Sequence, residues 1–218
     1  YEQQVQFSVV TKGTLKFRFA QSVLPEHLSK HSYDWIWVLD DDVAFADTDV
    51  DRLLATADSS GSLIVQPALK MDHPGGKIRR RARRTGCQPG SPMCNFLAPH
   101  AECLFRYVNF VEVMTPLFRQ EALLKVLVDC PNCIHKNSVW GLDLIWCSWT
   151  AKQLGKTLFD ACAVIDSRTV EHRNAKSLPK WSSPKHIQEY DMPAKWEVRK
   201  SFTKDFQTSF ATFGCVPK

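Results

Sequence analysis

Short apolar runs alternate with amphipathic segments along the chain, and the two periods predict strands and helices respectively. Strands are predicted at residues 5–10, 35–39, 63–65, 107–114 and 161–165. Helices are predicted at residues 14–24, 49–57, 119–128 and 140–154. Because strands and helices alternate, we expect an α/β domain whose mixed, mostly parallel sheet is flanked by helices. The run at 35–39 is apolar throughout, so we expect it to be a fully buried strand.

Two stretches of the chain lack a regular pattern. Residues 70–100 hold a basic run and many Gly and Pro residues, so a long loop is expected there. Beyond residue 175 the chain becomes rich in Lys, Ser and Pro, with scattered aromatic residues. We therefore expect one domain over residues 1–175 and an irregular C-terminal extension over residues 176–218.

Three consecutive carboxylates, Asp40, Asp41 and Asp42, follow the strand predicted at 35–39. Adjacent acids repel one another unless a cation lies between them, and Mg²⁺ and Mn²⁺ prefer carboxylate oxygens. Open α/β sheets also bind ligands beyond the carboxyl ends of their strands. The ordinary alternative is a solvated turn, and Asp49 is expected to cap the following helix. Asp40-x-Asp42 is thus a candidate for binding a metal that in turn binds a diphosphate.

Two further residues carry candidate chemistry. Asp143 is expected in the first turn of the helix at 140–154, where an acid either interacts with the helix dipole or serves as a general base. His172 follows the last predicted strand and is either a surface histidine or a third ligand beside the carboxylates. The residues by themselves leave both alternatives open.

The net charge of +5 comes from one short segment rather than from the whole chain. Six lysine and arginine residues lie between positions 77 and 84, and removing them leaves a balance of −1. No aromatic residues are interleaved with this run to stack on bases, so nucleic-acid binding is not expected. No apolar run reaches the ~20 residues that a membrane helix needs. We therefore expect contact with a membrane only through an anchor absent from this chain.

Eight cysteines are more than a protein of a reducing compartment usually carries. Cys87 and Cys94 stand in a Gly- and Pro-rich loop and are candidates for a disulfide. Cys130 and Cys133, with a histidine two residues further on, resemble half of a zinc site whose other half is missing. The cysteines expected to be core residues, from their apolar surroundings, are Cys147 and Cys162.

The order and separation of Asp40-x-Asp42, Asp143 and His172 resemble those of metal-dependent glycosyltransferases of the GT-A fold. These enzymes use a DxD motif, a downstream acid at a helix start and a late metal-binding histidine. The chain also resembles an uncharacterised eukaryotic family whose members are labelled lysine-ketoglutarate-reductase trans-splicing related. The segments that carry this likeness are residues 33–42, 66–69, 110–116, 140–143 and 164–167. The likeness covers roughly residues 5–175 and includes the positions of the two loop cysteines, Cys87 and Cys94.

The resemblance implies transfer of a sugar from a nucleotide-sugar donor to a hydroxyl of a glycan or other acceptor, with Mn²⁺ or Mg²⁺ as the cofactor. The implied roles are metal ligation for Asp40, Asp42 and His172, donor binding for Asp40, Asp41 and Lys16, and proton abstraction for Asp143. Glu112 and Trp140 are candidates for contacting the acceptor; the alternatives are a salt-bridge partner and a core residue, respectively.

The chain differs from the GT-A pattern in one respect, and two alternative functions are open. GT-A domains carry a strand–helix unit well before the DxD motif, whereas 39 residues precede Asp40, so we expect the first strand to be missing. A truncated or inactive binding module is the first rival. The second is a metal-dependent phosphohydrolase, although the chain lacks a Gly-rich loop that would bind phosphates. The resemblance and the cysteines imply the Golgi or ER lumen, with a type II membrane anchor outside this chain.

Overall fold

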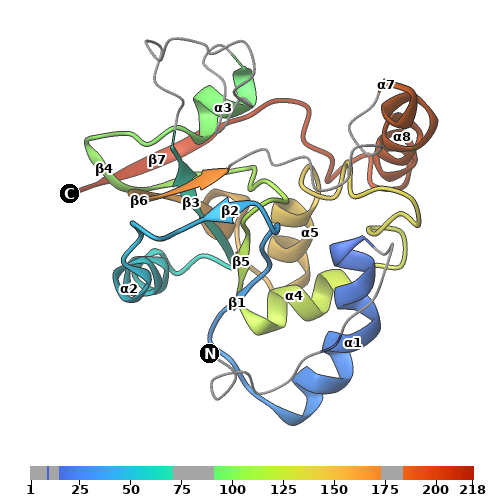
Figure 1. Cartoon of the computed structure of the whole chain (residues 1–218), viewed down its shortest axis with the longest axis horizontal. Helices are drawn as coiled ribbons and strands as arrows, with labels where there is room; N and C mark the ends of the chain where they lie inside the picture. Colours follow the sequence, from blue (N-terminus) through green and yellow to red (C-terminus); the bar gives the residue numbers. More distant parts are fainter. Residues whose placement is uncertain (1–8, 10–14, 71–90, 173–183) are drawn as a thin grey trace.

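A computed structural model describes residues 9, 15–70, 91–172 and 184–218 of the chain (Figure 1). The helices in these ranges are α1 (Lys16–Lys30), α2 (Val50–Ser60), α3 (Pro92–Leu97), α4 (Gln120–Leu127), α5 (Trp146–Gln153), α6 (Leu158–Ala161), α7 (Pro184–His186), the π-helical η2 (Ile187–Asp191) and α8 (Met192–Ser201). The strands are β1 (Ile36–Trp37), β2 (Val43–Ala44), β3 (Ile64–Leu69), β4 (Cys103–Val108), β5 (Leu117–Phe118), β6 (Cys162–His172) and β7 (Thr212–Pro217). Most of the strand predicted at 5–10, the basic run at 77–84 and Cys87 lie outside the described residues.

The strands form a mixed sheet in the order β1-β5-β3-β6-β4-β7, and β2 pairs with β6 beside this path. Among the described strands, β3 and β6 run parallel and every other pair is antiparallel. The domain is α/β with flanking helices as predicted, but the expectation of a mostly parallel sheet is wrong. All six residues of β3 are buried although one of its neighbours is antiparallel. When helices cover both faces of a sheet, an apolar strand no longer reveals its direction.

Helices lie on both faces of the sheet (Figure 1), and alternate residues of each strand point to opposite faces. On one face, Leu53 and Ala57 of α2 pack with Val65 of β3 and Ile165 of β6. On the other face, α1, α4 and α5 contribute to the larger core that contains Phe118. The domain therefore has three layers, with the sheet in the middle.

Three predicted elements differ from the prediction. The strand predicted at 107–114 is β4, which ends at Val108, so residues 109–114 lie outside it. The strand predicted at 35–39 is reduced to β1, and these residues are only half-buried rather than fully buried. β1 pairs with β5 alone, so it is an edge strand, which explains the partial exposure. The helix predicted at 140–154 begins only at Trp146, because Gly141 has a φ of +97°, outside the right-handed helical region. By contrast, α2 begins as predicted, with the Asp49 side chain accepting the backbone N–H three residues on.

Residues 184–218 contain helices and a strand, so the expectation of an irregular extension over residues 176–218 is wrong for the part that the structure describes. α8 and β7 lie at opposite ends of the molecule (Figure 1), so the chain between them crosses it. β7 pairs antiparallel with β4, and the disulfide Cys103–Cys215 joins the same two strands. β7 is an edge strand whose residues are exposed or half-buried, so its apolar signal in the sequence is weak. The region completes the sheet.

Every cysteine among the described residues is disulfide-bonded. Cys147 and Cys162 are buried core residues as predicted, and they also bond to each other, which was not predicted. Cys130 bonds to Cys133, which removes both sulfurs as zinc ligands. Cys94 is disulfide-bonded as well, and its predicted partner lies outside the described residues. None of the helices in the described ranges combines the length and apolar content that a membrane crossing requires.

Candidate functional site

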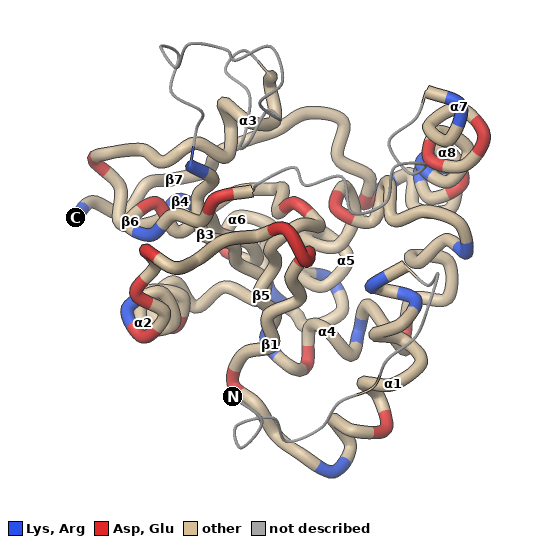
Figure 2. The backbone as a smooth tube through the Cα atoms, in the orientation of Figure 1, with Lys and Arg blue, Asp and Glu red and all other residues tan. Residues whose placement is uncertain are grey.

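The acidic run lies in the turn between β1 and β2, which is red near the centre of Figure 2. The backbone of Asp40 is fixed, because its N–H donates to the carbonyl of Met114 at 3.0 Å. Its carbonyl accepts the N–H of Val43 at 3.4 Å, which closes the turn. Asp40 and Asp42 are half-buried in this arrangement, whereas Asp41 is exposed.

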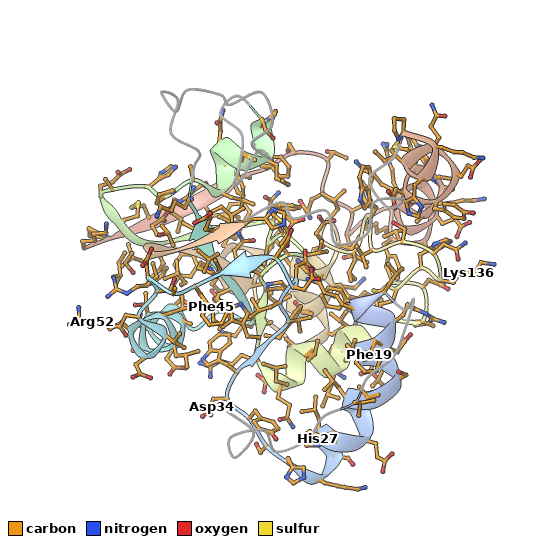
Figure 3. The ribbon with its side chains drawn as sticks, viewed as in Figure 1. Phe19, His27, Asp34, Phe45, Arg52 and Lys136 are labelled. Carbon is orange, nitrogen blue, oxygen red and sulfur yellow. A yellow bond between two sulfur atoms is a disulfide. The ribbon has the colours of Figure 1, made fainter. Side chains whose placement is uncertain are left out.

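Aromatic rings hold the two sides of this turn together. Phe45, which follows β2 and is labelled in Figure 3, has its ring 5.6 Å from the ring of Trp37 in β1. The indole N–H of Trp37 donates to the carbonyl of Thr115 at 3.0 Å. The acidic turn is therefore braced against the segment that leads into β5.

His172 reaches the acidic turn because β2 pairs with the end of β6. Val43 lies opposite His172 in that ladder, which places the imidazole next to Asp42. The Nε2 atom of His172 lies 3.1 Å from a carboxylate oxygen of Asp42. The candidate ligand atoms of Asp40, Asp42 and His172 all lie within 4.8 Å of one another. The three residues predicted as metal ligands therefore come together.

The chemistry of this group fits a divalent cation. Two carboxylates and one imidazole form a donor set that Mn²⁺ accepts, and carboxylates also suit Mg²⁺. The side chains of Asp42 and His172 are only 11% and 17% exposed, so the protein orients them rather than leaving them in solvent. Asp41 does not belong to the group, and its role with a donor stays a prediction.

Lys16, the first residue of α1, connects the acidic turn to a second group of acids. Its ammonium lies 2.7 Å from a carboxylate oxygen of Asp40. The same ammonium donates to the backbone carbonyls of Val113 and Met114. Those residues adjoin Glu112, so one lysine links the Asp40 carboxylate with the Glu112 segment. The role in donor binding that the resemblance implies for Lys16 stays a prediction.

Glu112 is a buried acid held mainly by backbone groups, with 8% of its surface exposed. Its N–H donates to the side-chain oxygen of Gln66 in β3, and its carboxyl accepts the N–H of Met114. Burial raises the pKa of Glu112 to about 8, and the charge of the neighbouring Asp143 contributes to the same shift. The alternative of a salt bridge finds no partner for Glu112 among the described residues.

Asp143 lies in the turn before α5, so the prediction that it occupies the first turn of a helix is wrong. The turn is closed by a hydrogen bond from the N–H of Leu144 to the carbonyl of Gly141, at 3.2 Å. Burial raises the pKa of Asp143 to about 7, and the positive charge of Lys195 opposes that rise. A carboxyl with this pKa accepts and releases protons readily at neutral pH.

Lys195 is a site residue that sequence reasoning missed, because the C-terminal region was expected to be irregular. α8 brings it to Asp143 through a close approach to Gly141, where an added Cβ would lie 3.2 Å from the Cα of Lys195. The hydroxyl of Ser138 donates to the carboxylate of Asp191 at 2.6 Å, just before α8 begins. The signals that could have revealed the helix are the i, i+4 spacing of its buried apolar residues, the proline in its first turn and the basic residues in its last turn.

Glu112, Asp143 and Lys195 line one cavity of about 310 Å³. Trp140 also lies on its wall and is 41% exposed, so the alternative that Trp140 is a core residue is wrong. The cavity adjoins the acidic turn, because Val113 lines it and offers its carbonyl to the lysine that pairs with Asp40. The predicted base and acceptor residues therefore lie together, next to the predicted metal ligands.

In the described part of the chain, a second group of side chains that could bind a metal consists of His100, Glu102 and Cys103. The sulfur of Cys103 is bonded to Cys215, so it has no thiolate to offer a metal. His100 and Glu102 instead form a partly exposed pair at 3.6 Å. The group at the acidic turn is therefore the stronger candidate.

Over residues 2–213, the sequence matches the model of a family described as "Protein of unknown function (DUF707)". The chain belongs to this family. The DUF707 match continues past residue 175 to the start of β7, so it includes the C-terminal elements that were expected to lie outside the domain. No curated protein and no solved structure matches the chain. The resemblance of this DUF707 chain to GT-A glycosyltransferases thus remains a prediction.

Proposed function

We propose that this chain is a metal-dependent glycosyltransferase that transfers a sugar from a nucleotide-sugar donor to an acceptor hydroxyl. The observation that carries the proposal is the convergence of Asp40, Asp42 and His172 to within 4.8 Å, beside a cavity that holds Asp143. A candidate cation site next to a proton-accepting acid suits a reaction in which a diphosphate leaves and a hydroxyl loses its proton. The assignment to the GT-A fold belongs to the same proposal.

Asp40, Asp42 and His172 are the residues that would hold Mn²⁺ or Mg²⁺. When bound, such an ion offsets the negative charge of a diphosphate leaving group. The ammonium of Lys16, 2.7 Å from the Asp40 carboxylate, supplies a further positive charge at the same place. Asp41 is exposed in the same turn, where we propose that it contacts the donor.

Asp143 would take the proton of the acceptor hydroxyl. In an inverting transfer, the acceptor oxygen bonds to the anomeric carbon as the bond from that carbon to the diphosphate oxygen breaks. The electron pair of the broken bond leaves with the nucleoside diphosphate, and the proton remains on Asp143. The pKa of about 8 keeps Glu112 protonated at neutral pH, so its carboxyl is able to donate a hydrogen bond to the acceptor.

The disulfides support a location in the lumen of the Golgi or ER. Every described cysteine is oxidised, and disulfides persist in oxidising compartments. We propose a type II membrane protein whose anchor lies outside this chain, with the domain described here facing the lumen.

Calorimetric titration of UDP and of GDP, with and without Mn²⁺, tests the proposal. We expect one of the two nucleotides to bind only when Mn²⁺ is present. Asp42→Ala should abolish that binding, because it removes a carboxylate ligand. Asp47→Ala is the matched control, since this nearby aspartate is 94% exposed and lies outside the ligand group.

Three other outcomes decide between the proposal and its rivals. Absence of nucleotide binding under every condition would leave an inactive binding module. Binding that Asp42→Ala does not alter would refute the assigned ligands. A phosphohydrolase would hydrolyse the diphosphate linkage of a nucleotide sugar and release the nucleoside monophosphate and the sugar 1-phosphate, whereas a glycosyltransferase acting on water as its acceptor would release free sugar and the nucleoside diphosphate.

A further inference from the structure

The cavity that holds Asp143 is apolar over most of its wall. Its ionisable side chains, within the described part of the chain, are those of Glu112, Asp143 and Lys195. The apolar side chains that line it include those of Met93, Val139, Trp140, Leu144 and Phe210. The volume of about 310 Å³ suits a small ligand.

Each of these three ionisable groups already interacts with another group of the protein. The Glu112 carboxyl accepts the N–H of Met114, and Lys195 opposes the charge of Asp143. A sugar carries a hydroxyl on nearly every ring carbon, and each hydroxyl that is buried without a partner costs free energy. The cavity is therefore equipped to bind one hydroxyl well, but not a ring of them.

Trp140 and Phe210 present a firm aromatic surface to the ligand. They are 41% and 36% exposed, so apolar surface remains open at the cavity. The ring of Phe210 lies 4.7 Å from that of Phe110 and 5.2 Å from that of Phe96, which fixes its position. Aromatic surfaces of this kind gain most from burial against another apolar body.

We infer that the acceptor is a small aryl or alkyl alcohol rather than a sugar. Its apolar body lies against Trp140 and Phe210, and its hydroxyl lies between Glu112 and Asp143. That this ligand is an acceptor rests on the proposed function. Its binding does not, because the cavity wall includes none of the candidate metal ligands.

Calorimetric titration of the chain with naphthol, without metal or nucleotide, tests this inference. We expect naphthol to bind at least tenfold more tightly than methyl glucoside. Methoxynaphthalene, which has the same rings but no hydroxyl, should bind about two- to tenfold more weakly than naphthol, because it loses one hydrogen bond. Equal affinities for naphthol and methyl glucoside, or for naphthol and methoxynaphthalene, would overturn the inference.

Two variants locate the binding. Trp140→Ala should weaken naphthol binding by about tenfold through loss of an aromatic contact. Trp196→Ala is the matched control, since this tryptophan is 54% exposed on α8 and is absent from the cavity wall. Phe210→Ala provides a second test from another segment of the chain. Unchanged affinity in both cavity variants would place naphthol elsewhere and refute the site.

Failure of this inference and failure of the proposed function give different results. Asp42→Ala should keep naphthol binding and lose the Mn²⁺-dependent binding of nucleotide. Binding of naphthol without any nucleotide binding would refute the glycosyltransferase proposal but keep the ligand class of the cavity. Nucleotide binding together with tighter binding of methyl glucoside would refute the ligand class alone.

Discussion

Replacing Gly141 with alanine is expected to disturb both the fold and the candidate base. Gly141 has a φ of +97°, and an added Cβ would lie 3.2 Å from the Cα of Lys195 and 3.2 Å from the Cβ of Val198. The strained backbone costs about 1–2 kcal/mol and the crowding against α8 about 1–3 kcal/mol. We therefore expect Gly141→Ala to lower the free energy of unfolding by about 2–5 kcal/mol.

Gly155→Ala separates the two contributions. Gly155 has a φ of +66°, and nothing lies within 4 Å of an added Cβ, so this variant carries the backbone strain without the crowding. Its expected loss is about 1–2 kcal/mol. Urea unfolding of both variants with intact disulfides, followed by tryptophan fluorescence and far-UV circular dichroism, gives the two values. The difference between them measures the packing of α8 against the turn that holds Asp143.

The same change should alter the acidity of Asp143. Any displacement of α8 moves Lys195 away from Asp143 and removes part of the interaction that lowers its pKa. We expect the pKa of Asp143 to rise above about 7 in Gly141→Ala and to stay unchanged in Gly155→Ala. Carboxyl-carbon NMR titration measures both. If Gly141→Ala costs no more stability than Gly155→Ala and leaves the titration of Asp143 unaltered, then α8 does not pack against this turn in the way described.

Three further predictions concern stability. In the wild-type chain the guanidinium of Arg106 lies 2.8 Å from the buried carboxylate of Asp166, and Arg106→Met removes this ion pair. Urea unfolding should show that the free energy of unfolding falls by about 3–5 kcal/mol, and a fall below about 1 kcal/mol would contradict this. Replacing Cys103 and Cys215 by serine removes a disulfide that spans 112 residues and should lower the free energy of unfolding by roughly 4–5 kcal/mol. An unchanged thermal midpoint would contradict this. Burial raises the pKa of Glu112 from its ordinary value of 4.5 to about 8 in the folded chain. The resulting stabilisation is therefore complete below about pH 4.5 and is lost as the pH rises through about 8. Glu112→Gln should remove that decline, and parallel pH profiles for the variant and the wild-type chain would show that the shift is absent.

Local features of the fold could be predicted because neighbouring residues determine them. The cap at Asp49 requires only a side-chain oxygen three residues before a free N–H, and α4 follows from its apolar spacing. Strand direction depends on distant partners. The residues of β3 are apolar because both of its faces are covered, and this pattern is typical of a parallel strand. Nothing in its own residues shows that β5 is antiparallel to it. β7 was missed because an edge strand needs few apolar residues.

The candidate site was predictable to the extent that its chemistry is concentrated in short motifs. The residue types of Asp40, Asp42 and His172 predict metal ligands, and the pairing of β2 with β6 brings their side chains together. Lys195 could not be found in this way, because its role depends on how α8 packs against Gly141. The raised pKa of Asp143 likewise follows from burial, which a single residue in a sequence does not reveal.

Direct titration of Mn²⁺, followed by electron paramagnetic resonance of the free ion, tests the proposed metal site most directly. We expect saturable binding of Mn²⁺ by the wild-type chain and a loss of about tenfold or more in affinity for His172→Gln. His100→Gln should bind Mn²⁺ as the wild type does, because His100 belongs to the group whose cysteine is held in a disulfide. Equal binding by the wild type and His172→Gln, or loss of binding only in His100→Gln, would contradict the assignment of the site.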